Sequence, residues 1–281
     1  MIDFSIIKIY RRGIEENLKG IKSILEKLKM KKVPLVIYED ALNQSSEQII
    51  SNWLSQKKYC RTFSVQKALG KLYPQKHIQL SLCIDVMVNI LDDLLDEPLD
   101  RKDKANYIIE FLRIFSLYEK KCPPKIHKCL EKYFEKLLTL AIAERFYQKQ
   151  ISQEKNIDKI AKDSADLLIC RGQDIDIFLE IALLEVRNKN LSSKIKKMGR
   201  IFRALNILKK DIKDIKHDQK NKIDTVITLV FSRTDIDFSM YINKVVDLLI
   251  QKTKKTREEP VSNFKQMIEK EKKEILRFVN L

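Results

Sequence analysis

Glycine is scarce in this sequence, with five residues in 281. Phosphate-binding loops and dinucleotide-binding fingerprints need several glycines at fixed spacings, so a P-loop or Rossmann-type nucleotide site is excluded. Apolar residues mostly recur every three or four positions, which indicates amphipathic helices and leaves little material for strands. The six prolines mark turns, and no fixed-period repeat or low-complexity linker divides the chain. We therefore predict an all-α helical bundle forming a single domain over residues 1–281.

The helices that this periodicity predicts fall between the prolines. We expect them at about 3–29, 37–56, 60–72, 76–96, 103–118, 124–150, 155–186, 191–217, 222–232, 236–255 and 260–278.

Long hydrophobic runs are also missing. No stretch approaches the roughly 18 uninterrupted apolar residues of a membrane span. The opening MIDFSIIKIYRR lacks the apolar run and small-residue cleavage site of a secretory signal. Five cysteines are scattered through the chain, so we expect reduced thiols and a cytoplasmic protein.

Positive charge is abundant, with 55 Lys and Arg against 39 Asp and Glu and a formal net charge of +16. The basic residues are mostly lysines spread along every segment, without the aromatic and basic interleaving of nucleic-acid readers. We therefore expect no nucleic-acid partner. Such a surface suits small anionic substrates, and it leaves peripheral contact with an acidic membrane face open.

The segment from Ile78 to Asp96 is almost entirely apolar except for one polar face. Asp85, Asn89, Asp92, Asp93 and Asp96 share that face at helical spacing. Burying clustered carboxylates is costly unless a positive charge neutralises them, so either a cation lies there or the face meets water. Asp92 and Asp96 are one turn apart, a spacing at which their oxygens suit a hard cation such as Mg²⁺ shared with substrate phosphates.

A second acidic face lies in MGRIFRALNILKKDIKDIKHD. Asn206, Lys210, Asp214 and Asp218 repeat every four residues, and Asp211 flanks them. The face is either a solvated helix surface with salt-bridged Lys and Asp or a second place for cations.

The motif DDLLDEPLDRK (Asp92 to Lys102) resembles the first aspartate-rich motif of the trans-isoprenyl diphosphate synthases, the polyprenyl synthetase family. KDIKD (Lys210 to Asp214) resembles the second motif, and NKIDTVITLVF resembles the lysine-containing segment that follows it. The first position of the second motif is held by Lys210 or, in a register anchored on Gly199, by Asn206. The family's upstream GGKRxRP is represented only by QKKYCRTF.

This resemblance implies an isoprenoid-synthase bundle with a central apolar cavity, Mg²⁺ as cofactor, and specific roles for named residues. The implied catalytic and metal-binding residues are Asp92, Asp93, Asp96, Asp211, Asp214 and, as a further metal ligand, Asp218. The implied diphosphate contacts are Arg101, Lys102, Lys222, Lys57, Lys58, Arg61 and Lys210. Met87, Val88 and Ile84 would line the pocket that sets chain length, because they precede Asp92 by about one to two turns.

The implied activity is a prenyl transfer. The enzyme would ionise an allylic isoprenyl diphosphate and elongate it with isopentenyl diphosphate to a product of 15 to 25 carbons, as a homodimer. Three alternatives stay open: a terpene cyclase, a relative that prenylates another acceptor, and a non-catalytic partner subunit of a prenyl synthase.

Overall fold

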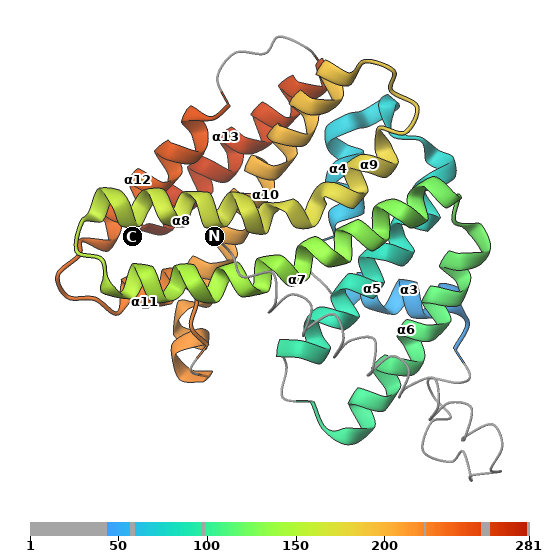
Figure 1. Ribbon diagram of the computed structural model, residues 1–281, viewed down its shortest axis with the longest axis horizontal. Helices are drawn as coiled ribbons and strands as arrows, with labels where there is room; N and C mark the ends of the chain where they lie inside the picture. Colours follow the sequence, from blue (N-terminus) through green and yellow to red (C-terminus); the bar gives the residue numbers. More distant parts are fainter. Residues whose placement is uncertain (1–43, 57–59, 97–98, 222, 254–258, 280–281) are drawn as a thin grey trace. The chain divides into compact units, whose positions relative to one another are not determined.

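The computed structural model describes residues 44–56, 60–96, 99–221, 223–253 and 259–279 (Figure 1). Within these ranges the chain consists of helices and connecting turns and contains no strand. The prediction of an all-α protein is therefore confirmed. The helix expected at 3–29 and the first part of that expected at 37–56 lie outside the described residues.

The α-helices keep close to the expected positions. They are α3 (Ser46–Gln56), α4 (Arg61–Leu69), α5 (Ile78–Asp96), α6 (Arg101–Lys121), α7 (Pro124–Gln153), α8 (Ile157–Arg171), α9 (Asp176–Ala182), α10 (Lys189–Asn221), α11 (Val226–Phe231), α12 (Phe238–Gln251) and α13 (Glu259–Val279). Short 3₁₀ turns, η2 (Gly70–Leu72), η3 (Gln75–His77) and η4 (Gly172–Ile175), connect some of them.

Local capping explains several helix starts. The Asn156 side chain accepts hydrogen bonds from two backbone N–H groups in the first turn of α8, and Asp237 does the same once for α12. Thr225 and Thr228 form a reciprocal capping box at the start of α11. These side chains satisfy N–H groups that have no partner within the helix. Pro124 begins α7, where its missing N–H costs no helical hydrogen bond.

The chain forms two compact units. The first comprises residues 1–53 and 86–117, and the second comprises residues 54–85 and 118–281. The helix α5 contributes its first part to the second unit and its last part to the first. The single domain and its central cavity stay predictions.

In the first unit, Trp53 of α3 packs on α6. Its indole Nε1 donates a hydrogen bond to Glu110 Oε2 at 2.7 Å, and its ring meets that of Tyr107 edge to face at 5.0 Å. This contact satisfies the polar atom of a buried aromatic residue. Burial raises the pKa of the Glu110 carboxyl above its usual range.

The second unit is built around the long helix α10. Helices α8, α11 and α13 and the turn η4 pack on it, and α12 packs on α8 (Figure 1). Phe178, Tyr241 and Phe264 are fully buried in this core together with many Ile, Leu and Val side chains. Burial of such apolar surface is the main favourable contribution to folding.

One predicted helix, 155–186, is wrong in its extent, because the chain breaks it at η4 into α8 and α9. At the break, the backbone of α10 comes so close that a Cβ on Gly172 would lie 2.5 Å from the carbonyl oxygen of Arg200. Only glycine permits this approach. The turn also directs Asp174 and Asp176 toward arginines of α10.

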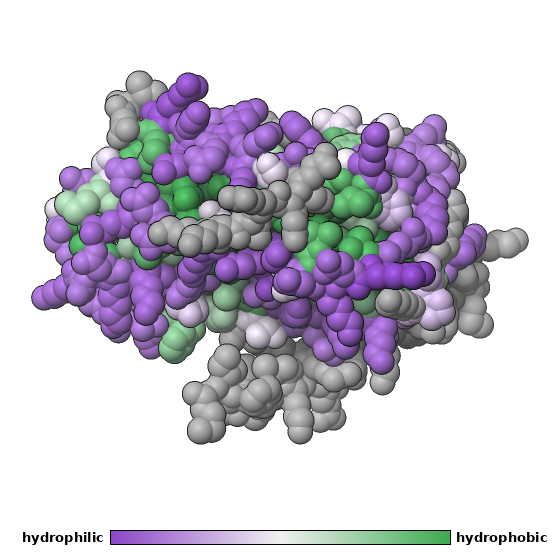
Figure 2. Space-filling model, turned by 90° about the horizontal axis from the view of Figure 1, so that it is seen from above, coloured by the Kyte–Doolittle hydropathy of each residue, from purple (hydrophilic) through white to green (hydrophobic). Residues whose placement is uncertain are grey.

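Hydrophilic residues cover most of the face shown in the space-filling view (Figure 2), as the composition suggests. No helix in the described part of the chain has both the length and the apolar character to cross a membrane.

Candidate functional site

The second acidic face lies on the C-terminal half of α10. Asp211 and Asp218 are buried, with exposed fractions of 5% and 7%, and Asp214 is half-buried. The spacing of three and four residues places the three carboxyls on neighbouring turns of one side of the helix. The expectation that these aspartates share a face is confirmed by their position on one continuous helix, and they do not form a fully solvated surface.

Arginine 171, the last residue of α8, is the nearest positive partner of this face. Its Nη1 donates to Asp211 Oδ2 at 2.6 Å, and its Nε lies 3.6 Å from Glu144 Oε1 on α7. Burial disfavours the charge on Arg171, but the two carboxylates outweigh burial and raise its pKa. The guanidinium thus neutralises the Asp211 carboxylate, whereas Lys210 on the same helix is exposed to solvent.

Asp218 has no ion-pair partner among the described residues. Burial raises its pKa, and the negative charges of Asp211 and Asp214 raise it further, whereas His217 and Lys210 oppose the shift. The ionised form of the Asp218 carboxyl is therefore disfavoured, and a cation bound beside it would favour that form.

These carboxylates fit a magnesium ion by chemistry, since Mg²⁺ takes oxygen ligands, keeps several waters and is commonly shared between one or two protein carboxylates and substrate phosphates. Among the residues that the structure describes, no three His, Cys, Asp or Glu side chains are grouped to hold a metal ion by themselves. The acidic face of α10, defined here as Asp211, Asp214 and Asp218, would therefore need a phosphate to complete the coordination.

The raised pKa of Asp218 predicts that Asp218→Asn changes the stability of the fold in a pH-dependent way. Because the pKa of Asp218 is higher in the folded state than in the unfolded state, ionisation of this carboxyl destabilises the fold. The free energy of unfolding therefore falls as pH rises from the unfolded-state pKa of about 3.9 through the folded-state pKa. We expect Asp218→Asn to raise the melting temperature at neutral pH and to lose this gain as pH is lowered below about 4. Thermal unfolding followed by circular dichroism measures both.

The matched control is Asp224→Asn, which removes an exposed carboxylate from the same region of the second unit. It should leave the melting temperature unchanged. A melting temperature that falls in Asp218→Asn at neutral pH would show that the Asp218 carboxylate has a stabilising partner and would contradict the argument.

The first acidic face follows α5. Asp92 is exposed, Asp93 is half-buried, and Asp96 is the last residue of the helix. Arg101 and Lys102 are exposed in the first turn of α6, which Asp100 caps by accepting a hydrogen bond from the Asp103 N–H at 2.8 Å. These five site residues lie in the first unit, whereas the acidic face of α10 lies in the second.

The three residues assigned to chain length are in the buried part of α5. Ile84 and Met87 are fully buried and Val88 is 7% exposed. Three predicted basic contacts, Lys57, Lys58 and Lys222, lie outside the described residues. Asn206, the alternative first position of the second motif, is half-buried and its amide donates to the Phe202 carbonyl at 2.9 Å.

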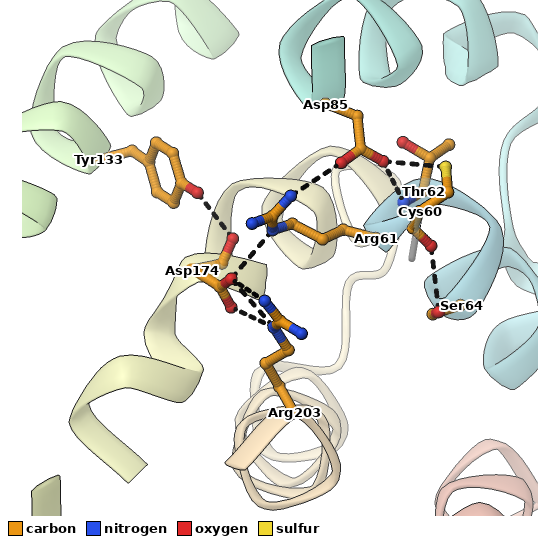
Figure 3. Close-up of polar contacts among 8 residues, drawn as sticks. All are labelled: Cys60, Arg61, Thr62, Ser64, Asp85, Tyr133, Asp174 and Arg203. Carbon is orange, nitrogen blue, oxygen red and sulfur yellow. Dashed lines mark hydrogen bonds and ion pairs between the residues drawn. The ribbon is translucent and has the colours of Figure 1, made fainter. Parts of the chain in front are cut away.

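Arg61, the remaining predicted diphosphate contact, is engaged in a buried ionic network (Figure 3). Its Nη1 lies 3.2 Å from Asp85 Oδ1, and its Nε lies 2.9 Å from Asp174 Oδ2. Asp85 also accepts hydrogen bonds from the Thr62 N–H and the Cys60 thiol. The carboxylate of Asp85, at the start of the polar face of α5, is thus neutralised by an arginine.

Asp174 is the centre of this network. Arg203 binds it through Nε and Nη2, and the Tyr133 hydroxyl donates to its backbone carbonyl at 2.7 Å. Burial opposes ionisation of Asp174, but Arg203 and Arg61 outweigh it and lower its pKa. Burial and the neighbouring Asp85 charge raise the pKa of the Cys60 thiol to about 12, so this thiol stays protonated at neutral pH.

Sequence reasoning missed Asp174, Arg203 and Tyr133. A signal was present in RGQDIDIFLEIA, where two acids interrupt an apolar run, because buried acids need positive partners. The partners themselves are 29 to 113 residues away in sequence and could not be paired by periodicity.

A comparison of the chain with protein-family models, curated proteins and solved structures found no match.

Proposed function

We propose that this protein is a Mg²⁺-dependent prenyltransferase that uses an allylic isoprenyl diphosphate as donor, with isopentenyl diphosphate as the acceptor that it elongates. One observation carries the proposal: Asp211, Asp214 and Asp218 follow each other at intervals of three and four residues on one side of α10, and Asp211 and Asp218 are buried. Such a cluster has the chemistry to bind a cation together with a diphosphate. The all-α architecture and the resemblance of DDLLDEPLDRK support the same assignment.

In this proposal each acidic face would bind Mg²⁺ through its own carboxylates, those of Asp92, Asp93 and Asp96 on α5 and those of Asp211, Asp214 and Asp218 on α10. Bound Mg²⁺ would neutralise charge on the departing diphosphate. Arg101 and Lys102 are exposed and have flexible side chains, so they can donate charge-assisted hydrogen bonds to phosphate oxygens. Lys210 and Lys222 contribute further positive charge.

The chemical step is cleavage of the allylic C–O bond. The electron pair leaves with the oxygen as pyrophosphate, and the allylic cation is attacked by the double bond of isopentenyl diphosphate, which then loses a proton. The basic residues stabilise the charge that develops on the leaving group. Apolar side chains exclude the water that would otherwise capture the cation.

Met87 provides a test of the tail-binding part of the proposal. It is fully buried on α5, five residues before Asp92, on the path proposed for the hydrocarbon tail. We expect Met87→Phe to shorten the longest product, because the ring would fill space that the tail uses. Mass analysis of extracted products measures the change.

Met87→Leu is the control, because it conserves volume and should cost less than about 1.5 kcal/mol of stability while keeping product length. An unchanged longest product in a folded Met87→Phe variant would remove Met87 from the tail pocket.

The function itself is tested by incubating the full chain with Mg²⁺ and C10, C15 or C20 allylic diphosphates, with and without isopentenyl diphosphate. Pyrophosphate release that requires isopentenyl diphosphate, with a longer prenyl diphosphate as product, is the expected result. Release without it, with a hydrocarbon or alcohol as product, would identify a cyclase instead. An absence of release in every mixture would contradict the proposal and favour a non-catalytic subunit.

A further inference from the structure

A second charged feature of the second unit is unrelated to the acidic face of α10. Between α8, the first half of α10 and the end of α12 lies a groove of about 590 Å³. We call it the basic groove. Its lining residues are Ile169, Lys189, Ser192, Ser193, Lys196, Lys197, Arg200, Ile201 and Lys252. Five of them are cationic, two carry hydroxyls, and none is acidic.

The polar residues of the basic groove form one stripe along α10. Lys189, Ser192 or Ser193, Lys196 or Lys197, and Arg200 follow each other at intervals of three or four residues, so one donor side chain occurs about every 5.4 Å over a length of about 16 Å. Lys252, from the end of α12, adds a positive charge from another element. A single phosphate would contact only one or two of these donors, whereas linked phosphates would contact several.

The charges in the groove differ in how far they are already neutralised. Lys196, Arg200 and Lys252 have carboxylate partners in the chain, Glu180 at 2.5 Å, Asp176 at 2.7 Å and Asp166 at 2.7 Å respectively. Lys189 and Lys197 are exposed and have no hydrogen-bond or ion-pair partner among the described residues. A ligand can therefore contact these two lysines without breaking an ion pair with any described residue.

We propose that the basic groove binds a soluble oligophosphate, meaning an anion with two or more linked phosphates such as a polyphosphate or the phosphate tail of a nucleotide. Charge-assisted hydrogen bonds from Lys189 and Lys197 hold the phosphates, and the Ser193 hydroxyl and the paired cations add further donors. The volume of the groove, about 590 Å³, falls in the range of roughly 300–1,000 Å³ typical of small-molecule pockets. Recognition of a small ligand fits this shape better than recognition of an extended polymer.

The basic groove is a separate site from the one proposed for the prenyl donor. Lys197 and Asp211 are fourteen residues apart on the same continuous helix, which corresponds to about 21 Å along its axis. Oligophosphate binding in the groove also needs no metal ion, because lysines and not carboxylates make the contacts. The two proposals can therefore fail independently of each other.

The test is a calorimetric titration of the full chain with tripolyphosphate in EDTA, which prevents metal-dependent binding at the acidic face of α10. We expect saturable binding to one site. The double substitution Lys189→Gln/Lys197→Gln should weaken it about tenfold or more, the loss expected for removing two charge-assisted contacts. A charge reversal, Lys197→Glu, should weaken it further while leaving the circular dichroism spectrum unchanged.

The matched control is Lys216→Gln/Lys220→Gln, which removes two exposed lysines from the other end of the same helix. It should bind tripolyphosphate as the unmodified chain does. Equal losses in the two double variants, or titrations that never saturate, would overturn the proposal in favour of general attraction to a basic surface.

Two further titrations separate other sources of phosphate. A short single-stranded oligonucleotide that binds more tightly than tripolyphosphate and depends on Lys189 and Lys197 would replace the proposal with a nucleic-acid surface. The second titration uses vesicles that contain a phosphorylated inositol lipid. If these vesicles bind the chain and soluble tripolyphosphate does not, the oligophosphate proposal would be replaced by a membrane-headgroup site. Competition of tripolyphosphate against both ligands would support the oligophosphate proposal.

Discussion

Replacing Asp174 with alanine is expected to cost about 3–5 kcal/mol of folding free energy, the range measured when one member of a buried ion pair is removed. Asp174 is the shared partner of Arg61 and Arg203, both of which are largely buried. Without it, Arg203 loses its Nε and Nη2 contacts to that carboxylate, and Arg61 loses its Nε contact while its Nη1 contact with Asp85 remains. Urea denaturation followed by circular dichroism measures the change as a lower midpoint at constant slope.

The control for this prediction is Asp158→Ala. Asp158 pairs with Lys244 at 2.6 Å on the surface, where the two side chains are 72% and 37% exposed, so its removal should cost less than about 1 kcal/mol. Because the pKa of Asp174 is lowered in the folded state, its carboxylate should contribute fully to the free energy of unfolding at pH values above the unfolded-state pKa of about 3.9. This contribution should disappear as pH falls through the folded-state pKa. Equal effects of the two substitutions would contradict the assignment of Asp174 as a buried charge centre.

Substitution of Asp214 by asparagine is expected to lower Mg²⁺-dependent pyrophosphate release by about 10²–10³-fold, the scale of losing one preorganised electrostatic contact in a transition state. Asp214 is half-buried, and among the described residues it has no hydrogen-bond or ion-pair partner. The substitution should therefore leave the fold intact. Steady-state release of pyrophosphate from the donor that works best in the substrate panel is the measurement.

Asp211→Asn should give a loss of similar size, but it also removes the negative partner of Arg171 and should lower stability as well. Comparing the activity and the stability of the two variants separates a loss of catalysis from a loss of folded protein. Asp224→Asn, an exposed control, should retain activity. Full activity in Asp214→Asn would exclude the acidic face of α10 from the reaction and would leave the proposed function without its main support.

Much of the fold follows from periodicity. The spacing of apolar residues placed α10 within a few residues of its observed ends and put Asp211, Asp214 and Asp218 on one side of it. A helix fixes which residues share a face whatever surrounds it, so this part of the site could be predicted from the sequence alone.

The partners of the charges could not be predicted in the same way. Asp85 belongs to the polar face of α5 that suggested a metal site, yet Arg61, 24 residues earlier, neutralises it. The break at Gly172 was missed for a related reason. The helical pattern continues through it, and only the approach of the Arg200 carbonyl from another helix makes the interruption necessary. Both features depend on tertiary packing.

The wide sequence separation of the Asp174 contacts has a kinetic consequence. Arg61 and Asp174 are 113 residues apart, and residues 86–117, which belong to the other unit, lie between them in the chain. Contacts of long sequence separation form only after a large loop has closed, which slows folding. Until that loop closes, the side chains of Arg61, Asp174 and Arg203 remain hydrated, so their contacts form late in folding. Substitutions at Asp174 should therefore raise the unfolding rate far more than they lower the refolding rate.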